Sequence, residues 1–321
     1  MSSDPQRCQI CGELPDYAHA DLAQNESLPT AAFKLEEIID GLKKCPACQS
    51  YFRYEYVYEY LVYGSYEDSY LHRIDRDEAI KLLMQTRKLT DKVCRELEHL
   101  GVKDAYAQIM ERLRQALEST DETLSAKNER HYALLTLVDH FLSTDRANLD
   151  ELLEHSDSHI RSGTLYFLMS RGANEVPRFI KRLADPIADV RNHAGWALRS
   201  RADLHGDISD ALDALTGVLA SDPELDVRRQ AADALAAAAL QEANISASLP
   251  ALTAALEVGF GVTRSAATAL RNAAAKGADI SLAVPGLRRC SADEDPFHKN
   301  IREVALEALR HFEARQNESS D

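Results

Sequence analysis

The chain has 321 residues, of which 45% are hydrophobic and 28% are charged, a composition typical of a folded, water-soluble protein. The formal net charge of −15 repels a phosphate backbone and favours a basic protein partner over nucleic acid. No apolar run approaches the ~20 residues that span a bilayer, and residues 1–15 lack the pattern of a signal peptide, so we expect a cytoplasmic protein without a membrane partner.

Two Cys-x-x-Cys motifs lie near the N-terminus. Cys8 and Cys11 form the first, Cys45 and Cys48 the second, and residues 12–44 separate them. Each motif presents two sulfurs from one tight turn, and four thiolates make the tetrahedral ligand set that Zn²⁺ prefers. The sequence therefore predicts one structural zinc ion with no open coordination position for catalysis. The alternatives are turns without metal, disulfide-linked turns, or a redox motif, which the lack of a surrounding βαβ pattern disfavours.

The two remaining cysteines, Cys94 and Cys290, lie alone in helical patterns. Because free cysteine is among the most buried residue types, we expect both to be buried thiols.

The segment between the two motifs contains the run TAAFKLEEIIDGL at residues 30–42. Its apolar spacing predicts a short helix that supplies a small core. The expected core residues are Phe33, Leu35, Ile38, Ile39 and Leu42.

A tyrosine-rich run, Tyr51–Tyr63, follows the second motif directly and alternates with a period of two, which predicts a β-strand in a hairpin or small sheet. The tyrosines between residues 51 and 70 either pack this module onto the first helices, or stack on bases or sugars, or present an edge to a peptide. Glu55 and Glu59 oppose the nucleic-acid alternative, and the role of the run stays open.

Helical patterns continue at residues 75–100, 102–117 and 127–142. Asp75 or Asp77 is expected to cap the first helix, and Gly101 to end it. We interpret residues 75–144 as connecting helices with an N-terminal helical hairpin, after a zinc-binding and tyrosine-rich module at residues 1–74.

A repeated phrase organises the rest of the chain. DPIADVRNHAGWAL at residues 185–198 returns as DPELDVRRQAADAL at residues 222–235. Five second helices align on the first β-branched residue of each copy, at intervals of 30 to 39 residues, as in arrays of helical hairpins. Positions 0, +4 and +8 are mainly apolar and form the predicted core face. The aligned residues are Ile160, Val190, Val227, Val262 and Ile301.

The first helix of each predicted hairpin precedes its aligned residue, and Asp189 and Asp226 are expected to cap second helices. The hairpins occupy residues 145–314, followed by a disordered tail at residues 315–321. The expected first helices cover residues 148–155, 176–184, 208–220, 249–258 and 282–290.

The phrase D-P-x-x-x-V-R-x-x-A-A-x-A-L resembles HEAT repeats, in particular the short bacterial kind called phycobilisome-lyase-like, over residues 145–312. The resemblance implies an α-solenoid of five HEAT-like hairpins. With the cysteine motifs, we expect a mainly α fold that begins with a small zinc-binding α+β module. The resemblance also implies a ladder in which the Asp and the following Arg join neighbouring repeats. Asp189/Arg191 and Asp226/Arg228 match that pattern, whereas Arg161 and Arg302 match only its Arg.

The repeat aligned on Val262 departs from this pattern. Thr263 stands where the arginine is expected, and Glu257-Val258 replaces Asp-Pro. We therefore expect the ladder to break at this repeat.

The second helices of such solenoids line the concave surface that usually binds partners. Six residues opposite the predicted core face are of types enriched at binding hot spots, and we assign them to partner binding. The alternative is that the tryptophan packs on the adjacent repeat and the arginines are solvated. The six residues are Tyr166, Trp196, Arg199, Arg229, Arg264 and Arg271.

Catalytic motifs such as a Gly-rich phosphate loop, a Gly-x-Ser-x-Gly elbow or His-Glu-x-x-His do not occur, and we assign no catalytic residue. The sequence thus favours a non-enzymatic scaffold or adaptor that binds a protein or peptide, such as a bacterial regulatory or immunity-type protein. The alternative is a HEAT-type enzyme, such as a lyase that acts on a bound chromophore or modified substrate.

Overall fold

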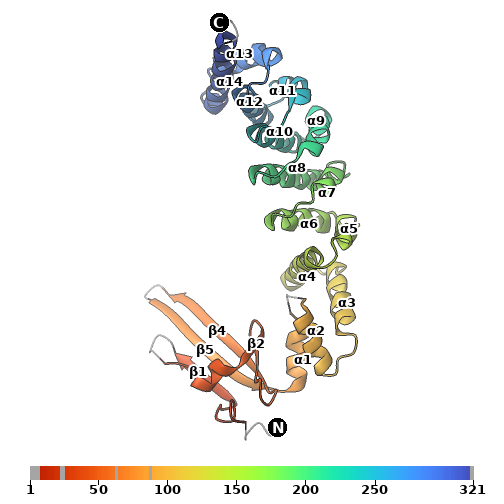
Figure 1. Cartoon of the computed structure of the whole chain (residues 1–321), viewed down its shortest axis with the longest axis vertical. Coiled ribbons are helices and arrows are strands. Elements are labelled where there is room, and N and C mark those ends of the chain that lie inside the picture. Colours follow the sequence, from red (N-terminus) through yellow and green to blue (C-terminus); the bar gives the residue numbers. More distant parts are fainter. Residues whose placement is uncertain (1–7, 22–25, 62–63, 87–88, 319–321) are drawn as a thin grey trace. The chain divides into compact units, whose positions relative to one another are not determined.

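The computed structural model describes residues 8–21, 26–61, 64–86 and 89–318 (Figure 1). They belong to two compact units, residues 1–140 and residues 141–321. The fold is mainly helical, with fourteen α-helices in the described ranges and a small antiparallel sheet in the first unit. None of the helices in these ranges combines the length and apolar character that crossing a bilayer requires.

A five-stranded sheet with the order β1-β5-β4-β3-β2 forms the N-terminal part of the first unit. The tyrosine-rich run is the strand β4, as predicted, and it pairs with β5 along its whole length, from Tyr51 opposite Ile74 to Leu61 opposite Gly64. Residues 62 and 63, the end of the predicted strand, lie outside the described residues. The strands are β1 (Tyr17–Asp21), β2 (Glu36–Ile39), β3 (Leu42–Lys44), β4 (Tyr51–Leu61) and β5 (Gly64–Ile74).

The helix predicted over residues 30–42 is wrong beyond its first turn. Only Thr30–Lys34 is helical, as one 3₁₀ turn (η3), and β2 and β3 then form a hairpin. Gly41 adopts φ +79° in the connecting turn, a conformation that glycine reaches without steric cost. Asp-Gly between two apolar runs is itself a hairpin signal, and here it outweighed the helical spacing of the same apolar residues. Phe33, assigned to the core, is 70% exposed.

The helix predicted over residues 75–100 is two helices, α1 (Arg76–Met84) and α2 (Asp91–His99). Thr90 starts the second helix, because its side chain accepts a hydrogen bond from the backbone N–H of Val93. The predicted ends are correct: Asp75 accepts a hydrogen bond from the N–H of Glu78, and Gly101 follows the last turn at φ +83°. Helices α3 (Ala105–Leu117) and α4 (Leu124–Ser143) come next.

Glu96 on α2 ties the sheet to the helices of the first unit. The Lys44 ammonium and the Tyr51 hydroxyl both donate hydrogen bonds to the same carboxylate oxygen of Glu96. Lys44 and Tyr51 are 7% and 6% exposed, so the Lys44–Glu96 ion pair is largely shielded from water. Burial, together with the Glu96 carboxylate, raises the pKa of Tyr51. The sequence pattern did not predict this contact.

In the described part of the second unit, five short helices each pack against the long helix that follows. The long helices also pack against one another in chain order, α6 on α8, α8 on α10, α10 on α12 and α12 on α14 (Figure 1). The short helices are α5 (Leu149–Leu153), α7 (Val176–Arg182), α9 (Leu212–Ser221), α11 (Leu249–Ala255) and α13 (Val284–Ala292). The long helices are α6 (Ser158–Ser170), α8 (Ala188–Asp203), α10 (Leu225–Leu240), α12 (Phe260–Ala275) and α14 (Lys299–Glu318).

The predicted core face of the long helices is confirmed. All five aligned β-branched residues are at most 4% exposed. The alanines four residues later, Ala194, Ala231, Ala266 and Ala305, are fully buried, and their small size lets neighbouring helices approach closely. Residues 315–318, predicted as the start of a disordered tail, continue α14 as helix.

An arginine–aspartate ladder joins successive repeats, but with a different aspartate from the expected one. Arg161 binds Asp185 through two hydrogen bonds of 2.8 Å, and Arg191 binds Asp222 through bonds of 2.7 and 3.0 Å. The acceptor is the aspartate of the next Asp-Pro pair.

The predicted caps Asp189 and Asp226 are wrong, because neither long helix has a side-chain cap. The Asp-Pro aspartates close the preceding turns instead, since Asp185 accepts a hydrogen bond from the N–H of Ile187 and Asp222 from that of Glu224.

The ladder ends where the sequence predicts a break. Arg228 donates to the backbone oxygen of Leu219, and the next repeat has no Asp-Pro aspartate to receive it. Thr263 replaces the arginine and donates to the oxygen of Leu256, across the turn before its own helix.

Candidate metal centre and exposed helix face

The four predicted cysteine ligands lie together in the first unit. Their sulfurs are all within 4.8 Å of one another, with Cys8 3.6 Å from Cys45 and Cys11 3.3 Å from Cys48. A tetrahedral ion with Zn–S bonds of about 2.3 Å places its sulfurs roughly 3.8 Å apart, close to this arrangement. All four are free thiols, so the disulfide alternative does not apply to this structure. The donor set therefore fits a metal ion.

Two tight turns bring the sulfurs together. In the first, the N–H of Gly12 donates to the oxygen of Cys8, and in the second, the N–H of Gln49 donates to the oxygen of Cys45. Gln49 adopts φ +66°, the left-handed conformation that glycine usually supplies at this position of such a turn. Its side-chain amide donates to the oxygen of Pro46 and holds that conformation.

The small core of the sheet surrounds the cysteines. Cys11 and Cys45 are fully buried in it, beside Phe52 and Leu71, whereas Cys8 and Cys48 are half-buried at its rim. A metal ion at this position would join the N-terminal segment to the β3–β4 connection and add a cross-link to a core of few large side chains.

The pKa values of the thiols differ according to their surroundings. Backbone N–H groups of Cys11 and Ile10 lower the pKa of Cys8 to about 6. Burial raises the pKa of Cys48, but hydrogen bonds from the side chain and backbone of Ser50 outweigh it and lower the value. Burial raises the pKa values of Cys11 and Cys45. Two thiols thus favour the thiolate form that binds metal, and two favour the protonated form.

Arg73 on β5 supports the first cysteine turn, a role that the sequence did not reveal. Its guanidinium donates to the backbone oxygen of Cys11 at 3.2 Å and to the Asp16 carboxylate at 3.1 Å, and it lies 4.7 Å from the centre of the Phe52 ring. No local motif marks this arginine, because its partners are distant in the sequence.

Replacing Arg73 with Met should weaken metal binding by about tenfold or more, as expected when a group that orients a ligand is lost. All four thiols remain, so metal binding itself is retained. A competition titration with a chromogenic chelator measures the affinity. Arg95→Met, which removes an exposed arginine bonded to its own helix, serves as the control. Equal affinities for the two variants would contradict this role of Arg73.

The two other cysteines do not join the cluster. Cys94 and Cys290, predicted as buried thiols, are half-buried, and partial burial raises the pKa of both.

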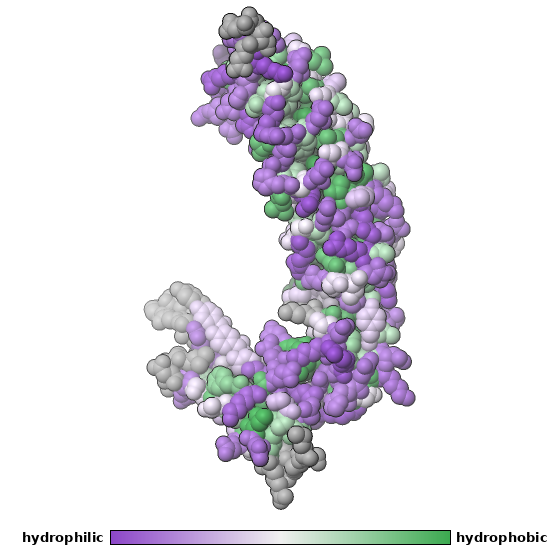
Figure 2. Space-filling view, viewed as in Figure 1, coloured by the Kyte–Doolittle hydropathy of each residue, from purple (hydrophilic) through white to green (hydrophobic). Residues whose placement is uncertain are grey.

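The aromatic residues of the predicted partner face lie side by side on consecutive long helices. Tyr166 on α6 is 42% exposed and Trp196 on α8 is 39% exposed, with ring centres 6.1 Å apart. The ring centre of His193 lies 6.1 Å from that of Trp196. In the view of Figure 2, hydrophobic residues of the second unit form small areas among hydrophilic ones.

The arginines of the predicted face are mostly paired with acidic residues. Arg199 lies 3.1 Å from Asp233 on the next long helix, and Arg229 lies 3.5 Å from the same carboxylate. Arg271 lies 3.2 Å from Glu307, and Arg264 is exposed. Acidic side chains thus neutralise most of the positive charge of this face. The sequence pattern did not predict these ion pairs.

No family model and no curated protein matches this chain. Among solved structures, an engineered protein is 21% identical with a TM-score of 0.47, over 64% of this chain and 96% of that chain. YibA of Escherichia coli is 17% identical with a TM-score of 0.43, over 74% and 82%. Cex1p is 14% identical with a TM-score of 0.48 over 75% of this chain, which spans about half (54%) of the Cex1p chain. Function is therefore inferred from the residues of this chain.

Proposed function

We propose that the protein is a non-enzymatic scaffold that binds a protein or peptide on the exposed face of its long helices. The observation that carries this proposal is the pair of exposed rings Tyr166 and Trp196, in contact across two consecutive helices. Tyrosine and tryptophan provide large, rigid contact surfaces and are enriched among residues that dominate binding energy.

The stacking of the long helices supports an array that can carry such a face. We infer that the five helix pairs form a HEAT-like α-solenoid, in which the arginine–aspartate ladder fixes the first repeats and the break at Thr263 alters the spacing of the later ones. In a solenoid each repeat contacts mainly its neighbours, so the long helices present one continuous surface.

The four cysteines support a structural role for the metal, and we propose that the ion is zinc. A full set of four thiolates leaves no position for a water or substrate, which is the arrangement of structural zinc sites. In this account the metal stabilises the tyrosine-rich sheet.

The partner is expected to present basic residues around an apolar or cationic side chain. The net charge of −15 attracts a basic protein, and the electron-rich faces of Tyr166 and Trp196 accept a lysine or arginine side chain as well as an apolar one.

Replacing Trp196 with Ala should weaken partner binding by roughly tenfold or more, because exposed aromatic anchors commonly contribute that much to affinity. The measurement is the dissociation constant of the partner that crosslinks to α6 and α8 in cells that make the protein. Tyr106→Ala is the matched control, since Tyr106 is 45% exposed but belongs to the first unit. Unchanged affinity of the folded Trp196 variant would remove this face from the proposed function.

A further inference from the structure

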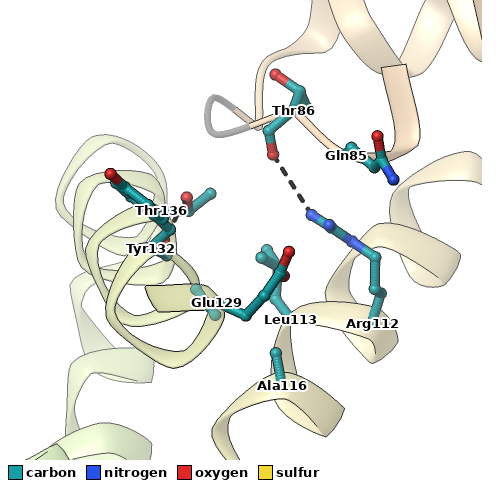
Figure 3. Close-up of a pocket in the computed structure, with 9 residues that line it drawn as sticks. Gln85, Thr86, Arg112, Leu113, Ala116, Glu129, Tyr132 and Thr136 are labelled. Atoms are coloured by element: carbon teal, nitrogen blue, oxygen red, sulfur yellow. Dashed lines mark hydrogen bonds between the residues drawn. The ribbon is translucent and has the colours of Figure 1, made fainter. Parts of the chain in front are cut away.

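A cavity of about 270 Å³ lies within the first unit, between the end of α1, one side of α3 and one side of α4 (Figure 3). Ligand pockets generally measure about 300–1,000 Å³, so this cavity lies at the small end of the range. Its volume suits a molecule of amino-acid size and is too small for a nucleotide. Neither the metal centre nor the exposed helix face includes any of the residues that line it.

Arg112 on α3 supplies a positive group in this cavity that is only partly satisfied. One terminal nitrogen donates to the backbone oxygen of Thr86 at a long distance of 3.4 Å. The Nε atom is buried, and it has no hydrogen-bond partner among the described residues. A ligand in the cavity therefore meets the terminal nitrogens, and the second of these has no hydrogen-bond partner among the described residues. The two terminal nitrogens of a guanidinium match the two oxygens of a carboxylate.

Glu129 supplies a negative group on the opposite wall. In Figure 3 its carboxylate projects from α4 toward the same space as the Arg112 guanidinium. The two groups interact electrostatically, but no ion pair joins them in the described part of the chain. Because opposite charges face the cavity without direct contact, each can take a complementary charge from a ligand.

The remaining walls restrict what that ligand can be. Leu113, Ala116 and Ala133 contribute apolar surface, which favours a compact molecule with some hydrocarbon. The Glu129 carboxylate repels a doubly charged anion such as phosphate. A small zwitterion matches both charges at once.

We propose that this cavity binds a free amino acid, with its carboxylate on the terminal nitrogens of Arg112 and its ammonium group facing Glu129. The thermodynamic advantage comes from pairing a guanidinium that the protein itself engages through one long hydrogen bond. This site is independent of the proposed scaffold function.

The test is isothermal titration of the full-length protein with the standard L-amino acids, and with the N-acetyl and amide derivatives of any that bind. Acetate, methylammonium and inorganic phosphate are titrated separately. The expected result is binding of at least one amino acid and loss of that binding when either charged end is blocked. Absence of binding by every amino acid would overturn the proposal, as would equal binding of acetate or phosphate.

Two substitutions locate the site. Arg112→Met should weaken binding at least about tenfold, whereas Arg114→Met, an exposed arginine on the same helix that does not line the cavity, should leave it unchanged. Because Glu129 is exposed, we expect Glu129→Gln to fold normally, and it tests the site even if Arg112→Met fails to fold. Glu129→Gln should weaken amino-acid binding and leave the N-acetyl derivative no weaker than before. Equal amino-acid binding by wild type and Glu129→Gln would also contradict the proposal.

Discussion

Replacing Cys45 and Cys48 together with serine should abolish metal binding and unfold the N-terminal sheet, while the helices of the second unit remain folded. The effect is expected to be large, because structural zinc contributes on the order of 10–16 kcal/mol in zinc-finger peptides at neutral pH. The core around Phe52 and Leu71 contains few large side chains, so we expect its stability to depend on the metal cross-link. Elemental analysis measures the metal, and hydrogen exchange of the sheet amides measures the unfolding.

Two cysteines outside the cluster provide the control. Cys94→Ser and Cys290→Ser should retain the metal and the protection of the sheet amides, since neither sulfur belongs to the cluster. A double variant of Cys45 and Cys48 that kept the metal or the full protection of the sheet would show that the cluster is not the stabilising site.

Replacing Arg161 with Ala should destabilise the second unit by about 3 kcal/mol, the lower end of the usual cost of breaking a buried ion pair. Arg182 lies 3.5 Å from Asp185 and still compensates part of its charge. The Arg161 and Asp185 side chains are only 8% and 1% exposed, and Arg161 also donates to the backbone oxygens of His155 and Ser156. Denaturant unfolding followed by circular dichroism gives the change in free energy.

Arg228→Ala is the matched control at the equivalent repeat position. Its arginine donates to a backbone oxygen and has no aspartate beyond it, so the expected cost is about 1 kcal/mol. Similar losses for the two variants would show that the aspartate ladder adds little to the stability of the array.

The same ion pair predicts how stability depends on acid. Burial raises the pKa of Asp185, but hydrogen bonds from Arg161 and the N–H of Ile187 outweigh it, and the folded-state pKa lies below the ordinary value of 3.8. A carboxylate with a lowered folded-state pKa contributes its full stability above its unfolded pKa and loses it as the pH falls through the folded one. Below about pH 4, wild type and Asp185→Asn should therefore converge in stability. A constant difference down to pH 2 would contradict this.

Local patterns in the sequence were sufficient to predict much of the fold. The helical hairpins followed from a phrase that recurs at regular spacing, and the burial of Val190, Ala194 and Leu198 matches the predicted period. The cysteine cluster followed from two short motifs. In both cases the residues that identify the feature lie within one turn or one helix.

Contacts between segments could not be predicted in the same way. The ladder pairs Arg161 with Asp185 because the Asp-Pro turn faces the preceding repeat, and no spacing rule distinguishes Asp185 from Asp189 before the repeats are packed. Arg73 and Glu96 likewise acquire their roles from strands and helices that meet only in the folded chain. The β2–β3 hairpin was missed for a different reason, because the apolar residues around Asp40-Gly41 fit a helical period as well as a strand period.

Native mass spectrometry of the full-length protein, purified directly from cells that make it, tests the central claim most directly. The account predicts a mass increment of one zinc ion and a bound protein or peptide that the Trp196→Ala variant, made in the same cells, does not retain. A chain without metal would contradict the proposed metal centre. A chain that carries only a small molecule, or that keeps its polypeptide partner in the Trp196→Ala variant, would contradict the proposed scaffold.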